Sequence, residues 1–313
     1  MIVAHTREEL AAARARLAGP VVLVPTMGAL HDGHRTLLRK ARSIASGGTI
    51  PPSPPLLTGG PVPPSPPGGD EPPSSGSVVI SIFVNPLQFG PNEDLDKYPR
   101  TLPEDLKIAE AEGADLVFAP SAADMYPRPQ VIMVDPGPVG DILEGEFRPG
   151  FFTGVLTVVL KLFMLVRPEV AVFGEKDAQQ LALVRRMAED FALGVEIHGV
   201  PTARAGDGLA LSSRNKYLSS AERPVATVLS AALSAGVAAA PEGPAAVLAA
   251  ARRVLDDAGD AVAVDYVELA DWQTPRGVRD EGFSGTATLA IAARVGTTRL
   301  IDNLPVRFDA ADD

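Results

Sequence analysis

The feature that most restricts the fold of this chain is a regular alternation of short apolar runs with helical patterns over residues 20–190. The runs, such as PVVLVP at 20–25, are rich in β-branched residues and too short for buried helices, which is typical of interior strands. Strands that alternate with helices predict a parallel sheet covered on both faces. We therefore predict an α/β, doubly wound parallel-sheet (Rossmann-like) domain. The expected strands are 20–25, 78–84, 115–118 and 170–173, and the expected helices are 34–45, 103–112, 152–166 and 177–190.

The last third of the chain has a different pattern. Two alanine-rich amphipathic stretches come first and three strand-like segments follow: 221–239, 243–258, 262–269, 286–293 and 298–302. This order is typical of an α+β domain, and 313 residues suit two domains at ~150 residues each. We place the boundary between 187 and 200. The expected domains are therefore a Rossmann-like domain at 1–190 and a smaller α+β domain at 191–313.

One segment, 46–77, fits neither domain because it is nearly all Pro, Gly and Ser. With almost nothing apolar to bury, it cannot offset the entropy of ordering, so we expect a disordered or polyproline-like insert. Its PxxP spacings could bind an aromatic groove, although a solvated insert is favoured. A helix over 34–45 spans ~16 Å. The insert should therefore leave and return at the sheet edge opposite the ligands, which bind beyond the carboxyl ends of the strands.

Composition excludes several classes of function. The formal charge of -11 argues against a nucleic-acid partner, although a local positive cluster could still bind a small anion. The chain has no cysteine, which excludes disulfides, thiolate metal sites and cysteine nucleophiles. The most apolar run, 151–166, carries Lys161 and is shorter than the ~20 residues of a bilayer span. We expect no membrane partner. Because the first residues lack a signal-peptide pattern, we expect a cytoplasmic protein.

The strongest local signal follows the first strand, where a glycine turn leads into a helix. Two histidines three residues apart stand where the free N–H groups of that helix point, and imidazole donors would extend such an anion site. A loop with incidental histidines is the alternative, and a metal site is disfavoured because no carboxylate or cysteine stands at suitable spacing. The run expected to bind a nucleotide is Met27, Gly28, Ala29, Leu30, His31, Asp32, Gly33 and His34.

Two further strand ends carry polar groups. Asn85 and Gln88 follow the second strand, and neutral amides suit a hydroxylated organic acid. Lys176 follows the strand at 170–173 and can neutralise charge on a phosphate, and Gln180 lies one helical turn later. Solvent-exposed loop amides and a plain helix-capping sequence are the alternatives at these positions.

Five ordered motifs make the pattern specific. The turn at 27–34 resembles the HIGH-type motif of the nucleotidyltransferase superfamily, which includes class I aminoacyl-tRNA synthetases, and within it the version found in the pantothenate synthetase (pantoate–β-alanine ligase) family. The other four motifs are similar to that family in the same order: FVNPLQFG at 83–90, YPRT at 98–101, FGEKDAQQ at 173–180 and LSSRN at 211–215.

The resemblance implies an ATP-dependent ligase that condenses pantoate with β-alanine through a pantoyl-adenylate, with ATP and Mg²⁺ as cofactors and a homodimer as the assembly. It places pantoate at Gln88 and Gln180, and Arg148 near the phosphates. It implies that LSSRN forms a mobile phosphate-binding loop within 204–216. The further nucleotide contacts that it implies are Gly174, Glu175, Lys176, Asp177, Ala203, Leu211, Ser212, Ser213 and Arg214.

The chain departs from the family pattern at three places. Phe151 stands where family members commonly have histidine, and the acidic pair associated with magnesium falls on Glu104 and Asp105, of which we carry over Asp105. The insert is the third departure. Of the phosphate-handling groups, we expect His34, with His31 beside it, to stabilise or protonate the leaving pyrophosphate with a pKa near neutrality.

Two other functions are compatible with the same fold. A cytidylyl- or adenylyltransferase for a phosphorylated alcohol would share the HxGH turn, but it would need more Lys or Arg at the acceptor pocket than the amides Asn85, Gln88 and Gln180 provide. A non-catalytic nucleotide-binding module would tolerate loss of Lys176 or Arg214. Release of AMP and pyrophosphate with pantoate alone, and then with β-alanine, separates the three functions.

Overall fold

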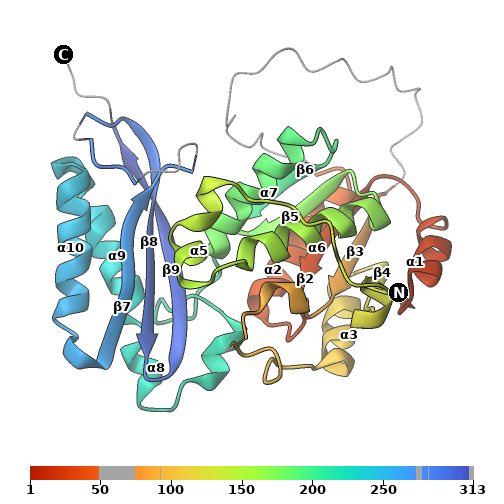
Figure 1. Cartoon of the computed structure of the whole chain (residues 1–313), viewed down its shortest axis with the longest axis horizontal. Helices are drawn as coiled ribbons and strands as arrows, with labels where there is room; N and C mark the ends of the chain where they lie inside the picture. The colour runs from red at the N-terminus through yellow and green to blue at the C-terminus, as the bar shows by residue number, and fades with distance from the viewer. Residues whose placement is uncertain (49–74, 92, 273–276, 281, 310–313) are drawn as a thin grey trace.

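The computed structural model describes residues 1–48, 75–91, 93–272, 277–280 and 282–309 (Figure 1). Six parallel strands form the first sheet in the order β1-β4-β3-β2-β5-β6. Three antiparallel strands form the second sheet in the order β7-β8-β9. The strands are β1 (Ile2–Ala4), β2 (Val21–Thr26), β3 (Ser77–Ile82), β4 (Leu116–Phe118), β5 (Val170–Gly174), β6 (Glu196–Val200), β7 (Val262–Ala270), β8 (Gly285–Val295) and β9 (Thr298–Phe308).

Helices cover both faces of the parallel sheet, because alternate strand residues point to opposite faces. In β2, Val21 and Leu23 pack in the core shared with α1, α6 and α7, whereas Val22 and Val24 pack in the core shared with α2 and α3. The helices of the first domain are α1 (Arg7–Arg14), α2 (Asp32–Ala45), α3 (Leu102–Ala111), α4 (Ala122–Met125), α5 (Glu144–Phe147), α6 (Phe151–Val166) and α7 (Ala178–Asp190). The predicted doubly wound α/β fold is confirmed.

The second sheet has helices packed on it and a separate core. The predicted helix at 221–239 is interrupted, and forms α8 (Glu222–Val225) and α9 (Val228–Ala238), while α10 (Pro244–Asp256) lies beside α9. Leu233 of α9 and Leu255 of α10 are buried against Leu289 of β8. The smaller α+β arrangement is therefore as expected (Figure 1).

The sequence pattern missed two strands. The short edge strand β1 pairs with β4, and β6 pairs with β5 at the other edge of the sheet. The domain boundary at residue 190 stays a prediction, but β6 lies beyond it and belongs to the first sheet. A division after Val200 fits the hydrogen bonding better.

Short 3-10 helices complete the described structure. Two of them, η1 and η3, follow β3 and β5 at the carboxyl edge, and η4 follows the loop after β6. They are η1 (Pro86–Gln88), η2 (Pro138–Asp141), η3 (Glu175–Asp177), η4 (Ser213–Tyr217), η5 (Ala240–Glu242) and η6 (Gly259–Ala261).

The predicted insert at 46–77 falls mostly on residues 49–74, which lie outside the described residues, so its disorder stays a prediction. The described flanks test its position. Ala45 ends α2 and its carbonyl accepts the N–H of Gly76, and Ser77 starts β3 beside Pro20. These flanks lie at the amino ends of the strands, which confirms that the insert is attached at the edge opposite the HxGH turn.

The apolar run at 151–166 forms the buried helix α6, in which ten residues, Phe152 and Val155 among them, are buried. Among the described residues, no helix is both long enough and apolar enough to span a bilayer.

Candidate active site

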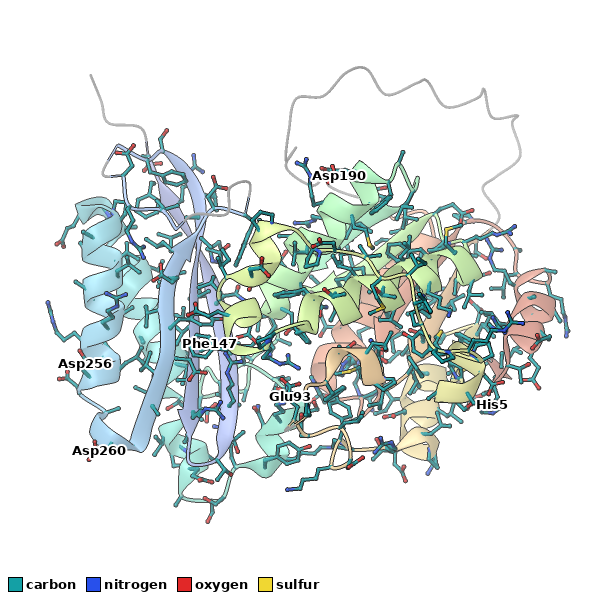
Figure 2. The ribbon with its side chains drawn as sticks, in the orientation of Figure 1. His5, Glu93, Phe147, Asp190, Asp256 and Asp260 are labelled. Atoms are coloured by element: carbon teal, nitrogen blue, oxygen red, sulfur yellow. The ribbon has the colours of Figure 1, made fainter. Side chains whose placement is uncertain are left out.

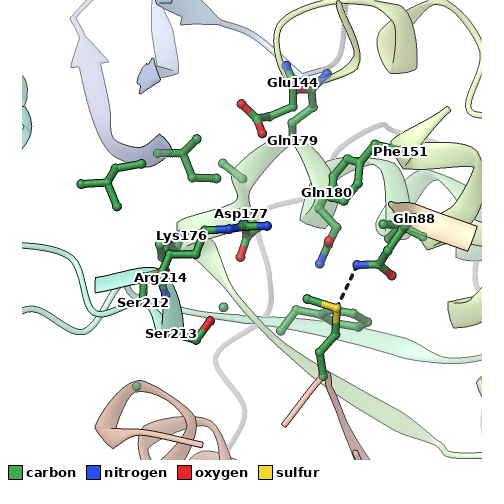
Figure 3. A pocket seen from close by; sticks show the side chains of 18 of the residues that line it. Gln88, Glu144, Phe151, Lys176, Asp177, Gln179, Gln180, Ser212, Ser213 and Arg214 are labelled. Carbon is green, nitrogen blue, oxygen red and sulfur yellow. Dashed lines mark hydrogen bonds and ion pairs between the residues drawn. The ribbon is translucent and has the colours of Figure 1, made fainter. Parts of the chain in front are cut away.

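A cavity of about 840 Å³ lies at the carboxyl edge of the parallel sheet. The turns that follow β2, β3 and β5 form one side, and residues of β8 and β9 contribute the other side. Strands β2 and β5 are neighbours although β3 and β4 intervene in sequence, so the strand order reverses here. Ligands of doubly wound sheets bind at such a reversal. Figure 3 shows side chains that line this cavity.

A buried carboxylate holds the turn after β2. Gly28 and Ala29 adopt positive φ values of 85° and 52°. Asp105, which is 1% exposed, accepts the N–H of Ala29 at 3.0 Å and the N–H of Leu30 at 2.8 Å. A Cβ on residue 28 would lie 3.0 Å from Asp105 Oδ2, so glycine is needed there. Asp105 is therefore a buried support of the turn and is not among the described residues that line the cavity, which gives no support to the expectation that it binds magnesium.

His31 and His34 stand at the N-terminus of α2 with ring centroids 4.2 Å apart. The Nδ1 atom of His31 accepts the N–H of Gly33 at 3.1 Å, and Nδ1 of His34 accepts the N–H of His31 at 3.2 Å. A neutral imidazole that accepts at Nδ1 carries its proton on Nε2. Because both rings line the cavity, their Nε2–H groups are the donors left for a ligand.

Both histidines are neutral at physiological pH. Burial, and then the charges of Lys176 and Lys216, lower the pKa of His31 to about 4. Burial, with His31 and Lys176 nearby, lowers the pKa of His34 to about 3. The expectation of a pKa near neutrality is therefore wrong for the ligand-free protein. These rings can donate hydrogen bonds to phosphate oxygens, but they are poor proton donors.

Lys176 reaches the same part of the cavity from the turn after β5. Its side chain is 19% exposed and its Nζ lies 4.0 Å from Asp177 Oδ1. The Lys176 charge lowers the pKa of both His31 and His34, which requires the three side chains to be close. Lys176, His31 and His34 therefore line one cavity, although they come from the turns after β5 and β2.

The amides after β3 have separate tasks. Asn85 is 1% exposed, and its Oδ1 accepts a hydrogen bond from the Tyr126 hydroxyl at 2.9 Å. Its Nδ2 donates to Gln88 Oε1 at 3.0 Å and to the Gly154 carbonyl at 3.1 Å. Protein groups thus hold Asn85, which orients Gln88. Asn85 also lines the cavity, and its expected contact with substrate stays a prediction. Within the described part of the chain, the partner of Gln88 Nε2 is the weak acceptor Met27 Sδ at 3.2 Å, which leaves this amide available to a ligand.

Gln180 and its neighbour Gln179 differ in the same way. Gln180 lines the cavity and its amide projects into it in Figure 3. Gln179 is 5% exposed, and its Nε2 donates to the carbonyls of Val139 and Ile142. Gln180 is therefore the residue of the pair that can contact substrate.

Two arginines at the cavity are each paired with an acid of the loop after β3. Arg148 forms two 2.7 Å bonds with Glu93 and lies 3.6 Å over the ring of Phe151. Phe151 thus supports Arg148. Arg214 donates to Asp94 at 3.1 Å from Nη2. The pairs keep both guanidinium groups at the cavity wall, and Figure 2 labels Glu93 and Phe147 beside the junction of the two domains.

The LSSRN segment also lies at the cavity. Ser212 caps η4 by accepting the N–H of Arg214 at 3.3 Å, and the hydroxyl of Ser213 is 3.3 Å from that of Tyr98. The N–H of Leu211 donates to the carbonyl of Ala203 at 2.9 Å, which closes the base of the loop.

The structure brings most of the predicted residues together. Those that line the cavity are Met27, His31, Gly33, His34, Asn85, Gln88, Arg148, Gly174, Lys176, Asp177, Gln180, Ala203, Leu211, Ser212, Ser213 and Arg214. Three other predicted residues, Gly28, Ala29 and Leu30, form the turn that Asp105 holds. The carbonyl of Glu175 accepts a hydrogen bond from Asn303. The Asp32 side chain is 84% exposed and lies beside Arg35.

Sequence reasoning missed the contribution of the second domain. Asp302 and Asn303 of β9 line the cavity, as does Arg299, whose guanidinium bonds to Glu144 of the first domain at 2.6 and 2.9 Å. The sequence pattern indicated only a strand in this segment. Glu93 and Asp94 could have been found from the sequence, because they closely follow the FVNPLQFG motif at 83–90, which lies at the site.

The sequence matches the family described as Pantoate-beta-alanine ligase over residues 2–47 and 73–305. The chain belongs to this family. Residues 48–72, which the match leaves out, fall inside the predicted insert. The family match and the named relatives support the ligase over a cytidylyl- or adenylyltransferase for a phosphorylated alcohol and over a non-catalytic nucleotide-binding module.

Similar proteins cover nearly the whole chain. The pantothenate synthetases of Thermobifida fusca (strain YX) and Acidothermus cellulolyticus are each 53% identical, over 97% and 98% of this chain and 95% and 92% of their own lengths. The pantothenate synthetase structure from Thermus thermophilus has a TM-score of 0.82 and 40% identity, covering 97% of this chain and 99% of that one. The ligase from Francisella tularensis, complexed with beta-gamma ATP and beta-alanine, has a TM-score of 0.73 and 31% identity, with 97% of each chain covered.

Proposed function

We propose that this pantoate–β-alanine ligase activates pantoate with ATP as a pantoyl-adenylate, and that the cavity holds both substrates of that step. The observation that carries the proposal is the convergence of Lys176 with the neutral rings of His31 and His34 on one cavity. The same cavity presents the free amides of Gln88 and Gln180, which suit an acid with hydroxyl groups. The complex of the Francisella relative supports the nucleotide assignment.

In the first step, a carboxylate oxygen of pantoate attacks the α-phosphorus of ATP. The bond from that phosphorus to the bridging oxygen breaks, and pyrophosphate leaves. Lys176 offsets the negative charge that develops on the α-phosphate. The Nε2–H groups of His31 and His34 donate to phosphate oxygens, beside the free N–H groups of α2. Because both rings are neutral in the ligand-free protein, we assign them to hydrogen bonding of the departing group.

Groups of the LSSRN segment, which lines the same cavity, receive the pyrophosphate. Ser212, Ser213 and Arg214 offer hydroxyl, backbone and guanidinium donors on one short segment. Arg148 adds a second guanidinium. Because both arginines are already paired with acids, their remaining N–H groups are the ones that meet the phosphates.

In the second step, the neutral amine of β-alanine attacks the acyl carbon, and the bond from that carbon to the AMP oxygen breaks. The proton lost from nitrogen passes to solvent. Gln88 and Gln180 hold pantoate through both steps, so that positioning and exclusion of water supply the catalysis.

Magnesium fits as an ion that the triphosphate brings. Among the described residues no group of three or more His, Asp or Glu could hold a metal, and Mg²⁺ is commonly bound by substrate phosphates and one or two carboxylates. We propose Asp177, which lines the cavity with a half-exposed side chain, as the carboxylate that would face it. The ion would neutralise phosphate charge.

We also propose a homodimer and a cytoplasmic location, where ATP is supplied. Val131 and Ile132 are 82% and 79% exposed, and Met164 is 61% exposed. The segment of Val131 runs along α6, because Gln130 is bonded to Lys161 at 3.4 Å, one turn before Met164. A cluster of large exposed apolar side chains suits a second copy of this chain. Replacement of Ile132 by glutamate should give a monomer by light scattering, and an unchanged mass would contradict this interface.

An isotope transfer tests the adenylate. Pantoate labelled with ¹⁸O in its carboxylate should pass one labelled oxygen to AMP in each turnover, because the attacking oxygen stays on phosphorus when the amide forms. Pyrophosphate release should need pantoate but not β-alanine. AMP without label would contradict the adenylate.

A further inference from the structure

Two adjacent residues of the second domain bind the two segments that handle the nucleotide. Asn303 of β9 is 8% exposed, and its Nδ2 donates to the carbonyl of Glu175 at 3.0 Å and to that of Lys176 at 2.7 Å. Both hydrogens of this amide are therefore used on η3, the turn that carries the Lys176 side chain into the cavity.

Asp302, the preceding residue, holds the other segment. Its two carboxylate oxygens accept from Nη1 and Nη2 of Arg204 at 2.7 and 2.9 Å, and the Asp302 side chain is 2% exposed. Nη1 of Arg204 also donates to the Gly208 carbonyl at 3.0 Å, and residue 204 forms a β-bridge with Ala210. This fixes the base of the loop that continues into Ser212, Ser213 and Arg214.

The two contacts are coupled to each other. The N–H of Asn303 donates to Asp302 Oδ1 at 2.8 Å, and Nη2 of Arg204 donates to the carbonyl of Asn303 at 3.2 Å. Strand β9 packs against both η3 and η4. Strand β9 of the second domain thus sets the separation between η3 of the first domain and the 204–214 loop of its own domain.

We infer that Asp302 and Asn303 are positioning residues for adenylate formation, acting through Lys176 on one side and the 204–214 loop on the other. The inference rests on the proposed function of those two segments. Turns of three residues have little internal stability, so the place of Lys176 Nζ depends on what holds its backbone. A displacement of ~1 Å can slow a positioned reaction ~10²-fold. The second domain, on this view, does more than cover the cavity.

The test separates the two half-reactions. Asn303→Asp keeps the size of the side chain but turns an oxygen toward the two carbonyls, and Asn303→Ala removes the donors without repulsion. We expect both variants to lower pantoate-dependent ATP–pyrophosphate exchange at least ~10-fold, with Asn303→Asp the slower. Reaction of added pantoyl-adenylate with β-alanine should stay within ~2-fold, since Lys176 acts before that step.

Arg307→Ala is the matched control, because this residue lies on the same strand with an 83% exposed side chain. It should leave both half-reactions unchanged. If the Asn303 variants slow both half-reactions equally, or neither, the positioning role is overturned.

A double-mutant cycle distinguishes this inference from the function that it rests on. In a Lys176→Ala background, Asn303→Ala should cause no further loss of exchange, because the residue acts through Lys176. If Lys176→Ala alone leaves exchange intact, the proposed role of Lys176 fails. If Lys176→Ala is slow and Asn303→Ala still adds its full effect, only the inference fails.

The contact between Asp302 and Arg204 is tested separately through the KM values of the two substrates. Asp302→Asn leaves the Arg204 guanidinium with a neutral partner and loosens the base of the 204–214 loop. We expect the KM for ATP to rise several-fold with a smaller change in the KM for pantoate. An equal rise in both constants would overturn the assignment to the nucleotide loop.

Discussion

The neutral state of His34 gives a stability that depends on pH in a predictable way. The pKa of His34 falls from 6.5 to about 3, chiefly through burial. Between these two values the unfolded chain binds a proton that the folded chain does not. The contribution of neutral His34 to the free energy of unfolding is therefore complete above pH 6.5 and is lost as the pH falls. At ~1.4 kcal/mol per unit, the change from pH ~7 to pH ~5 removes about 2 kcal/mol of the free energy of unfolding.

The matched variant is His34→Asn, because the Asn Oδ1 can take the place of Nδ1 in accepting the N–H of His31. It carries no charge at any pH. Urea unfolding of both proteins, followed by circular dichroism at pH ~7 and pH ~5, gives the difference. Wild type should lose about 2 kcal/mol more than the variant on acidification. Losses that agree within ~0.5 kcal/mol would refute the reasoning, since carboxylates affect both proteins alike.

Three further outcomes are expected. His34→Ala should lower single-turnover adenylate formation at least ~10²-fold with the fold intact by circular dichroism, and a near-wild-type rate would count against its role. Tyr126→Phe removes the donor to Asn85 Oδ1, so the KM for pantoate should rise ~3- to 10-fold while that for ATP stays constant; steady-state kinetics decide this. Glu144→Gln weakens the interdomain pair with Arg299. The unfolding transition should broaden or split in calorimetry, and an unchanged single transition would show that other contacts join the domains.

The parts of the fold that could be predicted are the elements whose own residues show a clear pattern of apolar positions. Strand β2 is buried on both faces, so its apolar run is continuous, and the helix after it begins within two residues of the predicted start at His34. The edge strand β1 has three residues and a mixed burial pattern, and therefore gives almost no signal. Strand β6 (EIHGV) has only two strongly apolar residues, which are not adjacent, so it lacks the continuous apolar run that marks β2.

The histidines, Lys176 and Gln88 were found from sequence because each follows a strand end, and parallel strands bring their carboxyl ends to one edge. The supporting roles of Asn85 and Asp105 were not predictable, because they depend on partners that are distant in the sequence. Asp105 binds two backbone N–H groups of a turn 75 and 76 residues away. Asn85 depends on Tyr126, 41 residues distant. Such partners follow only from packing.

The electrostatics of the cavity follow from the same packing. The histidine motif suggested proton transfer, because a solvated imidazole titrates near neutrality. Burial at the entrance of α2, next to the positive charge of Lys176, removes that capacity in the free protein. The charge that lowers both pKa values is also the one placed to meet the triphosphate. A bound polyanion would compensate the Lys176 charge and favour a proton on the rings. The proton affinity of this site therefore depends on its ligand, and a histidine pattern in a sequence fixes the position of the rings but not their charge.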